Sequence, residues 1–171
     1  MNTKTQQTMF STGKDNWETP DDLFQIYHDR YRFVLDAAAD SHNHKCPDWL
    51  GPGGLHDDAL EVSWQPWLRK GSIWLNPPYS RGLQARFVAK AVEEARKIQA
   101  TWRTEREKDM TKLLDWEYGS IVCLLPARTD TKIFHELVVP NHRYEIIFLK
   151  GRVRFKGAAA GAPFPSMIVV F

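Results

Sequence analysis

Short apolar runs alternate along the chain with longer segments in which apolar residues recur every three or four positions. The runs FVLD (33–36), SIWL (72–75) and SIVCLL (120–125) predict strands, and the last is apolar throughout, as in a strand buried on both faces. The helical spacing predicts helices between and after these runs. Alternation of helices with apolar strands predicts an α/β fold with a largely parallel sheet.

Polar residues mark where the first and last of the expected helices begin. Thr19 is expected to cap the first helix, with Pro20 at its first helical position. Asp21 and Asp22 would then lie beside the positive end of the helix dipole. Asp130 is expected to cap the last helix in the same way.

Three segments toward the C-terminal end predict further strands, namely YEIIFL (144–149), GRVRF (151–155) and SMIVVF (166–171). No helix-length segment separates them, and parallel strands need a long crossover connection. We therefore expect antiparallel C-terminal strands at one end of the otherwise parallel sheet.

The chain is expected to form a single domain over residues 16–171, preceded by a loose polar arm over residues 1–15. Within the domain, residues 96–118 are rich in charges of both signs and read as a possible insertion. A solvated helical hairpin is one interpretation of this segment, and a surface that recognises a partner is the other.

The amino-acid composition excludes few classes of protein. The 171 residues are 43% hydrophobic and 26% charged, as in an ordinary globular protein, and the net charge of +2 does not point to nucleic acid, so a basic surface must come from local arrangement. Two cysteines are too few for a disulfide scaffold, which favours a cytoplasmic protein. We expect neither a signal peptide nor a membrane span.

The segment IWLNPPYS (73–80) ends an apolar run with an amide, two prolines and an aromatic ring. Pro77 and Pro78 lack a backbone N–H and have a fixed φ, so the chain must leave the sheet in a stiff, extended form. In open α/β sheets, ligands bind at the carboxyl ends of the strands. Asn76 and Tyr79 are therefore candidate site residues.

Seven segments taken in order resemble the small phage-type DNA N6-adenine methyltransferases, a Dam-like family. They are NWETP (16–20), FVLDAAAD (33–40), DALEVSW (58–64), WLNPPYS (74–80), LLPARTDTKIFH (124–135), LKGRVRF (149–155) and APFPS (162–166). The resemblance implies a Rossmann-like methyltransferase that uses S-adenosyl-L-methionine and acts on double-stranded DNA in a bacterial or phage-infected cell.

The resemblance assigns the chemistry to Asn76, Pro77, Pro78 and Tyr79. The amine of adenine is a poor nucleophile because its lone pair is delocalised into the ring. The Asn76 side-chain oxygen and the Pro77 carbonyl would accept hydrogen bonds from its two N–H groups, and the prolines would hold that carbonyl in place. Tyr79 would stack on a base that has been flipped out of the duplex.

The resemblance also implies a cofactor site. Its expected residues are Trp17, Thr19 and Pro20 as a lid, Asp36, Ala37, Ala38 and Ala39 on the methionine and ribose side, and Asp58 on the adenine amino group. Alternatives stay open for three of these positions. Asp57 could take the place of Asp58, Asp36 could be a surface turn acid, and Trp17 could simply cover the core.

Basic residues that could contact DNA are concentrated near the C-terminal strands. Lys150, Arg152, Arg154 and Lys156 alternate, so they would share one face of a strand, either to bind phosphates or to protect a sheet edge. Arg128 follows the apolar run 120–125 and would reach the rim of the site. In residues 96–118, a target-recognition element is the alternative to a passive hairpin.

Two other functions and one metal site remain as alternatives. The first function is methylation of cytosine at N4, and the second is a catalytically silent DNA-binding relative, against which the intact Asn76–Tyr79 segment argues. His42, His44, Cys46 and His56 carry zinc-type ligand atoms, but their spacing matches no familiar finger and methyl transfer needs no metal. Loop histidines, with no metal, are the favoured interpretation.

Overall fold

The computed structural model describes residues 17–80, 82–109, 118–142 and 145–171. The expected arm over residues 1–15 lies outside these ranges, and so does the part of the charge-rich segment over residues 110–117. In the described part of the chain, no helix is both long and apolar enough to cross a membrane.

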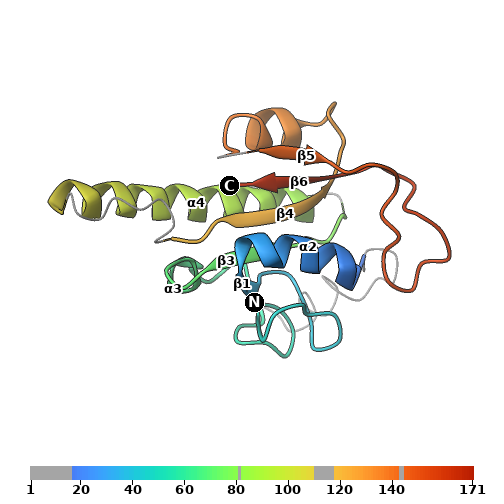
Figure 1. Cartoon of the computed structure of the whole chain (residues 1–171), viewed down its shortest axis with the longest axis horizontal. Coiled ribbons are helices and arrows are strands. Elements are labelled where there is room, and N and C mark those ends of the chain that lie inside the picture. Colours follow the sequence, from blue (N-terminus) through green and yellow to red (C-terminus); the bar gives the residue numbers. More distant parts are fainter. Residues whose placement is uncertain (1–16, 81, 110–117, 143–144) are drawn as a thin grey trace.

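Six strands form one mixed sheet with the order β2-β1-β3-β4-β6-β5 (Figure 1). The elements are α2 (Asp21–Tyr31), β1 (Phe33–Asp36), β2 (Asp48–Trp49), α3 (Gln65–Leu68), β3 (Ser72–Leu75), α4 (Leu83–Lys108), β4 (Ile121–Pro126), the π-helix η1 (Ile133–Val138), β5 (Ile146–Phe148) and β6 (Ser166–Val170). The first four strands in this order are parallel, whereas β6 is antiparallel to both β4 and β5. The expected α/β class is confirmed, with β6 as the reversed strand.

The strands β3, β4 and β6 are buried on both faces, which explains their apolar runs. Along β4, Ile121, Cys123 and Leu125 face one core with α3, α4 and η1, whereas Val122 and Leu124 face a second core with α2. A strand covered on both sides has no exposed face, so every position can be apolar. Cys123 is accordingly a free, fully buried thiol whose pKa is raised by burial.

Three details of the predicted elements were wrong. Thr19 does not cap α2, because Pro20 is the N-cap residue and makes no side-chain capping bond. Asp130 does not cap η1; instead, the hydroxyl of Thr131 accepts a hydrogen bond from the Phe134 N–H (3.3 Å). Residues 151–155 pair with no strand, although exposure does alternate there, with Phe155 buried and Arg152 and Arg154 exposed.

The sheet order places a topological switch point between β1 and β3. The chain passes from β1 to β2 on one side and returns to β3 on the other, so the carboxyl ends of β1 and β3 are adjacent. Asp36 ends β1 and pairs with Trp74, which lies two residues before Asn76 in the chain. Ligands of open α/β sheets bind in the crevice at such a point. This edge lies at the right-hand side of Figure 1, together with the β5–β6 connection.

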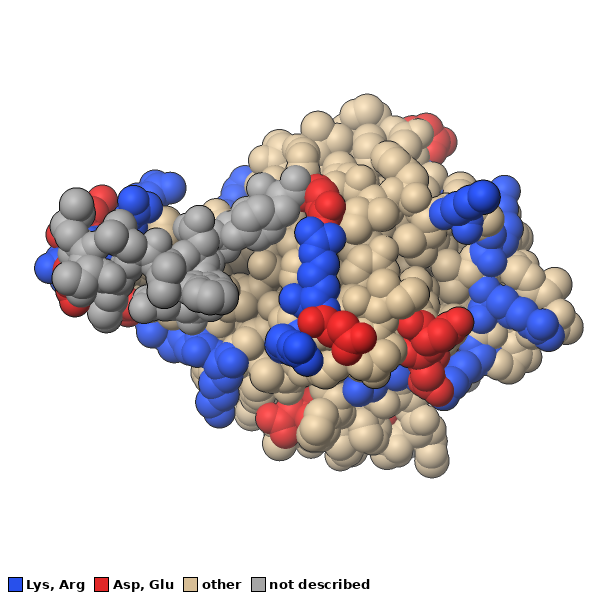
Figure 2. Space-filling model, in the orientation of Figure 1, with Lys and Arg blue, Asp and Glu red and all other residues tan. Residues whose placement is uncertain are grey.

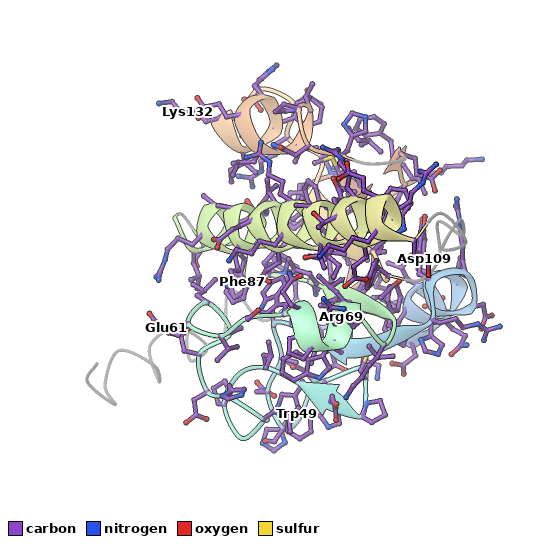
Figure 3. All side chains as sticks on the ribbon, turned by 90° about the vertical axis from the view of Figure 1, so that its left-hand side faces the viewer. Trp49, Glu61, Arg69, Phe87, Asp109 and Lys132 are labelled. Atoms are coloured by element: carbon purple, nitrogen blue, oxygen red, sulfur yellow. The ribbon has the colours of Figure 1, made fainter. Side chains whose placement is uncertain are left out.

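Helix α4 begins at this edge and runs away from it (Figure 1). Its 26 residues span about 39 Å at 1.5 Å per residue, and Ile98 is the last of its buried residues. Figure 3 shows the helix crossing from Phe87 to Asp109, with Arg69 beside its later part, where Arg69 contacts Glu105 (3.4 Å). The structure therefore does not bring the described part of segment 96–118 to the Asn76 edge.

Candidate active site

The side chain of Asn76 is held by the segment that precedes α2. Its Nδ2 atom donates to the carbonyl oxygen of Trp17 (2.5 Å) and to Oγ1 of Thr19 (3.1 Å). Thr19 is 2% exposed and Asn76 is half-buried, so this is a partly buried hydrogen bond between positions 57 residues apart. Residues 17–19, which we call the strap, thus cross the carboxyl edge of β3 and contact Asn76 directly.

The hydroxyl of Tyr79 lies within hydrogen-bond distance of Oδ1 of Asn76 (2.8 Å) and of the carbonyl oxygen of Leu124 (3.1 Å). Burial raises its pKa well above the usual value, so the group is a neutral donor. The Tyr79 ring packs against Trp17, Phe155 and Phe164 at centroid distances of 6.5, 6.1 and 5.5 Å.

Tyr79 also lines a cavity of about 430 Å³. It is bounded by the start of α4, the end of β4 and the start of η1, and its lining residues include Gln84, Arg128 and Phe134. Ser80 and Thr131 also line it, so polar residues share the wall with apolar ones such as Leu125 and Met167. Its size is that of a small-ligand pocket.

Asp36 is almost completely buried at the end of β1, with 3% exposure. One carboxylate oxygen accepts the Ala38 N–H (3.3 Å) and the other accepts the Lys45 N–H (3.0 Å), so the side chain holds the turn after β1 in shape. Burial raises the pKa of Asp36 to about 6, against the lowering effect of these two hydrogen bonds. The small residues Ala37 and Ala39 of this turn are buried.

Asp58 is half-buried and forms a local turn, in which Oδ1 accepts the Leu60 N–H (2.9 Å). Its other oxygen has no partner among the described residues. Asp57 is exposed, and its Oδ1 accepts the Gly53 N–H (3.4 Å). Of the two, Asp58 is therefore the acid nearer the core, next to the buried Ala59.

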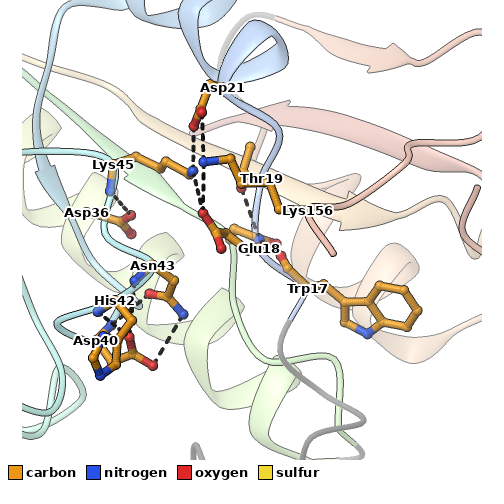
Figure 4. Close-up of polar contacts among 11 residues, drawn as sticks. Trp17, Glu18, Thr19, Asp21, Asp36, Asp40, His42, Asn43, Lys45 and Lys156 are labelled. Atoms are coloured by element: carbon orange, nitrogen blue, oxygen red, sulfur yellow. Dashed lines mark hydrogen bonds and ion pairs between the residues drawn. The ribbon is translucent and has the colours of Figure 1, made fainter. Parts of the chain in front are cut away.

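Two lysines and two acids fix the strap to the loops on either side of it (Figure 4). Lys45 Nζ contacts Glu18 (2.9 Å) and Asp21 (2.7 Å), and Lys156 Nζ contacts the same two carboxylates (3.2 and 2.7 Å). The backbone N–H of Lys156 also donates to the Glu18 carbonyl (2.9 Å). Lys156 is thus engaged within the protein, whereas the sequence pattern grouped it with the DNA-facing cations.

The remaining basic residues of that group are exposed near the same edge. Figure 2 shows Lys and Arg side chains gathered at the right-hand end of the molecule, over the β5–β6 connection of Figure 1. Lys150, Arg152 and Arg154 belong to this connection and are exposed, and Arg154 Nε donates to the Ala158 carbonyl (3.2 Å). Arg128 is exposed, with its guanidinium 5.8 Å from the Phe164 ring centroid.

The histidine-rich loop has structural contacts of its own. The His44 ring stacks on Trp49 at 4.1 Å, and its Nδ1 lies 2.9 Å from the Cys46 carbonyl. Cys46 is a buried free thiol whose pKa is raised by burial. Among the residues that the structure describes, no three His, Cys, Asp or Glu side chains form a group that could hold a metal ion.

The structure brings together Asn76, Tyr79, Trp17 and Thr19 at one edge, with Asp36 at the neighbouring strand end. Sequence reasoning missed the roles of Lys45, Phe155 and Phe164, which hold the strap and enclose Tyr79. Each of these contacts joins segments far apart in the chain, and no local spacing predicts them. The available signal was the presence of two aromatic residues, Phe155 and Phe164, in the connection between β5 and β6.

Comparison with known proteins gives two matches. The model of a family described as DNA N-6-adenine-methyltransferase (Dam) matches residues 6–170. A protein of Escherichia phage T1 described as DNA N-6-adenine-methyltransferase is 35% identical over 82 residues, which are 47% of this chain and 31% of that protein. The chain thus matches less than a third of the length of this relative. No solved structure gives a significant match.

Proposed function

The chain belongs to the DNA N-6-adenine-methyltransferase (Dam) family, and from this premise we propose that it transfers a methyl group from S-adenosyl-L-methionine to N6 of adenine in double-stranded DNA. The observation that carries the proposal is the position of Asn76–Pro77–Pro78–Tyr79 at the carboxyl end of β3, beside the switch point with β1. In a Rossmann-like sheet this is the place where cofactor and substrate meet.

Asn76 and Pro77 provide the two acceptors that the target amine needs. Because both hydrogens of the Asn76 amide point to the strap, Oδ1 is the atom left to accept from the substrate. The carbonyl of Pro77 accepts no hydrogen bond among the described residues, and the proline rings on both sides of it fix its direction. Acceptors that are fixed before the reaction lower the barrier without reorganisation.

The residues around the switch point fit a cofactor with an adenosine and an amino-acid end. Asp58 offers a carboxylate oxygen without a protein partner, and Asp36 holds the turn of Ala37–Ala39, whose small side chains let a ligand approach the backbone. When bound there, S-adenosyl-L-methionine would supply an electrophilic methyl group on a good leaving group. Trp17, Thr19 and Pro20 would cover the cofactor. The strap, which precedes α2, already crosses this edge of the sheet and contacts Asn76.

We place the flipped base in the cavity beside Tyr79. Extrusion of a paired base costs about a few kcal/mol, and stacking on an aromatic ring returns roughly 1–3 kcal/mol per base. Tyr79 lines the cavity, and its ring packs against Trp17, Phe155 and Phe164, so it offers a fixed aromatic surface on which a base can stack. Arg128 at the cavity wall would contact a flanking phosphate.

The exposed cations of the β5–β6 connection would bind the DNA backbone. Lys150, Arg152 and Arg154 belong to the β5–β6 connection, which lies at the same edge as the carboxyl end of β3 (Figure 1), and Figure 2 shows Lys and Arg side chains over that end of the molecule. Contacts to phosphate position the duplex without reading its sequence. The net charge of only +2 therefore does not argue against DNA as the substrate, since the cations are gathered where they are needed.

Incubation with duplex DNA and labelled S-adenosyl-L-methionine, followed by analysis of the nucleosides, tests the proposal. We expect N6-methyladenine with the parent protein and a rate lower by on the order of 10²–10³ with Asn76→Ala. N4-methylcytosine in its place would change the substrate assignment but keep the site. Cofactor and DNA binding without any methylated nucleoside would overturn the proposal in favour of a silent DNA-binding relative.

A further inference from the structure

An asparagine amide can present either its oxygen or its nitrogen to a substrate, because rotation by half a turn exchanges the two ends. Only the oxygen can accept a hydrogen bond. At the end of β3, Asn76 would thus place a donor in front of the target amine whenever its amide turned over. A catalytic asparagine therefore needs a second group that distinguishes its two ends.

We propose that Thr19, together with the carbonyl of Trp17, is a positioning residue that locks the Asn76 amide with Oδ1 toward the substrate; this rests on the function proposed above. The carbonyl of Trp17 only accepts, and it lies 2.5 Å from Nδ2. Thr19 Oγ1 takes the second amide hydrogen at 3.1 Å. After a half turn, Oδ1 would face the Trp17 carbonyl and two oxygen atoms would repel each other.

The burial of Thr19 restricts the Asn76 amide to this orientation. Thr19 is 2% exposed, so water cannot replace its hydroxyl without opening the strap. An unpaired polar hydrogen at a buried site costs far more than one in solvent. The strap is itself anchored, since Glu18 lies between Lys45 (2.9 Å) and Lys156 (3.2 Å), as Figure 4 shows. Trp17 and Thr19 therefore approach Asn76 from a fixed backbone.

The Tyr79 hydroxyl does not compete with this role. It lies 2.8 Å from Oδ1 of Asn76, but the carbonyl of Leu124 is a second acceptor at 3.1 Å. When an amine approaches Oδ1, the hydroxyl can keep its hydrogen bond to Leu124, and no buried donor is left unpaired. The locked oxygen is thus available to the substrate.

The same geometry explains why this chain has an amide and not a carboxylate at position 76. A carboxylate has no hydrogen to donate, so one of its oxygens would face the Trp17 carbonyl at hydrogen-bond distance. Thr19 could reverse its hydroxyl and donate, but a backbone carbonyl cannot. We therefore expect Asn76→Asp to lose methyl transfer by more than tenfold because the strap is displaced.

Thr19→Val and Thr19→Ser test the inference, because valine keeps the shape of threonine without the hydroxyl and serine keeps the hydroxyl. We expect single-turnover methyl transfer at saturating cofactor and DNA to fall about tenfold in Thr19→Val and to stay within about twofold of the parent in Thr19→Ser. The control is Thr101→Val on α4, whose hydroxyl bonds to the Lys97 carbonyl far from Asn76 (3.0 Å) and which should match the parent.

A double-variant cycle separates a positioning role from a purely structural one. Thr19→Val should lower the folding equilibrium constant about fivefold in the parent but less than twofold in Asn76→Ala, where no amide remains to be held. Equal losses in both backgrounds, or an unchanged transfer rate in a folded Thr19→Val protein, would overturn the inference. Absence of methyl transfer in the parent would instead overturn the proposed function, and the folding cycle would still report on the contact.

Discussion

Protonation of Asp36 should stabilise the fold and make it respond to pH in an unusual direction. The side chain is 3% exposed, and burial raises its pKa from 3.8 to about 6. The folded state therefore holds this proton more tightly than the unfolded chain does. The contribution is fully present below about pH 4 and is lost as the pH rises through 6, the reverse of an ion-paired carboxylate.

The two pKa values set the size of the effect. Between pH 7.5 and pH 4.5, the folded state with a pKa of about 6 gains roughly 2 kcal/mol over an unfolded chain with a pKa of 3.8. The free energy of unfolding should be measured by urea titration at several pH values for the parent and for Asp36→Asn. Subtraction removes the other titrating groups, and Asp36→Asn keeps the size of the side chain without a titrating proton.

The difference between the two proteins should thus shift by about 2 kcal/mol in favour of the parent as the pH falls. Cofactor affinity should move the opposite way, because the ionised form accepts the N–H groups of Ala38 and Lys45 that shape the turn. Stability curves of the parent and Asp36→Asn that run parallel from pH 4.5 to 7.5 would refute the reasoning, since the buried carboxylate would then not be perturbed.

Two other perturbations follow from the site and its surroundings. Tyr79→Phe keeps the stacking face and frees Oδ1 of Asn76, so single-turnover transfer should stay within about threefold of the parent. The Leu124 carbonyl loses its hydrogen bond to the hydroxyl, so the free energy of unfolding should fall by about 1 kcal/mol. A loss of transfer as large as in Asn76→Ala would show that the hydroxyl itself takes part. Replacing Arg152 and Arg154 by alanine should reduce the slope of log affinity against log salt by about 2 for every DNA sequence, whereas Arg103→Ala on the distal part of α4 should leave the slope unchanged. An unchanged slope in the first protein would favour an edge-protecting role for these arginines.

Local pattern was sufficient where the sheet is buried on both faces. The runs 33–36 and 72–75 coincide with β1 and β3 because each has three consecutive apolar residues and the chain leaves the sheet directly after it. The same reasoning failed at 151–155, where exposure alternates as in a strand. There the inward residue Phe155 packs on Trp17 and Tyr79 at 5.2 and 6.1 Å, and no neighbouring strand provides a ladder. Alternating exposure along a segment indicates only that one of its sides is buried. An aromatic cluster can bury that side as well as a sheet can.

Thr19 shows why the site was only partly predictable. Its residue type and its place before Pro20 and two aspartates fit a helix cap, and the family resemblance placed it in a lid over the cofactor, but neither interpretation pointed to Asn76. In the fold, its hydroxyl instead meets Asn76, 57 positions later in the chain. Asn76 itself was predictable as a site residue because the two prolines after it indicate a stiff, extended segment at the end of a strand. The spacing of residues could not show that a segment from the beginning of the domain binds the nitrogen end of the Asn76 amide.

The ion cluster extends this dependence to the opposite end of the chain. Lys156 follows Phe155, and its backbone N–H and Nζ both contact Glu18, so the C-terminal connection that encloses Tyr79 also anchors the strap. Lys45 ties the same strap to the loop whose N–H binds Asp36. Acceptor orientation at Asn76, enclosure of Tyr79 and the shape of the turn after β1 therefore share one set of contacts. A substitution in the strap, in the loop that contains Lys45 or in the β5–β6 connection should therefore weaken contacts in the other two segments. We expect this edge of the sheet to fold cooperatively for that reason.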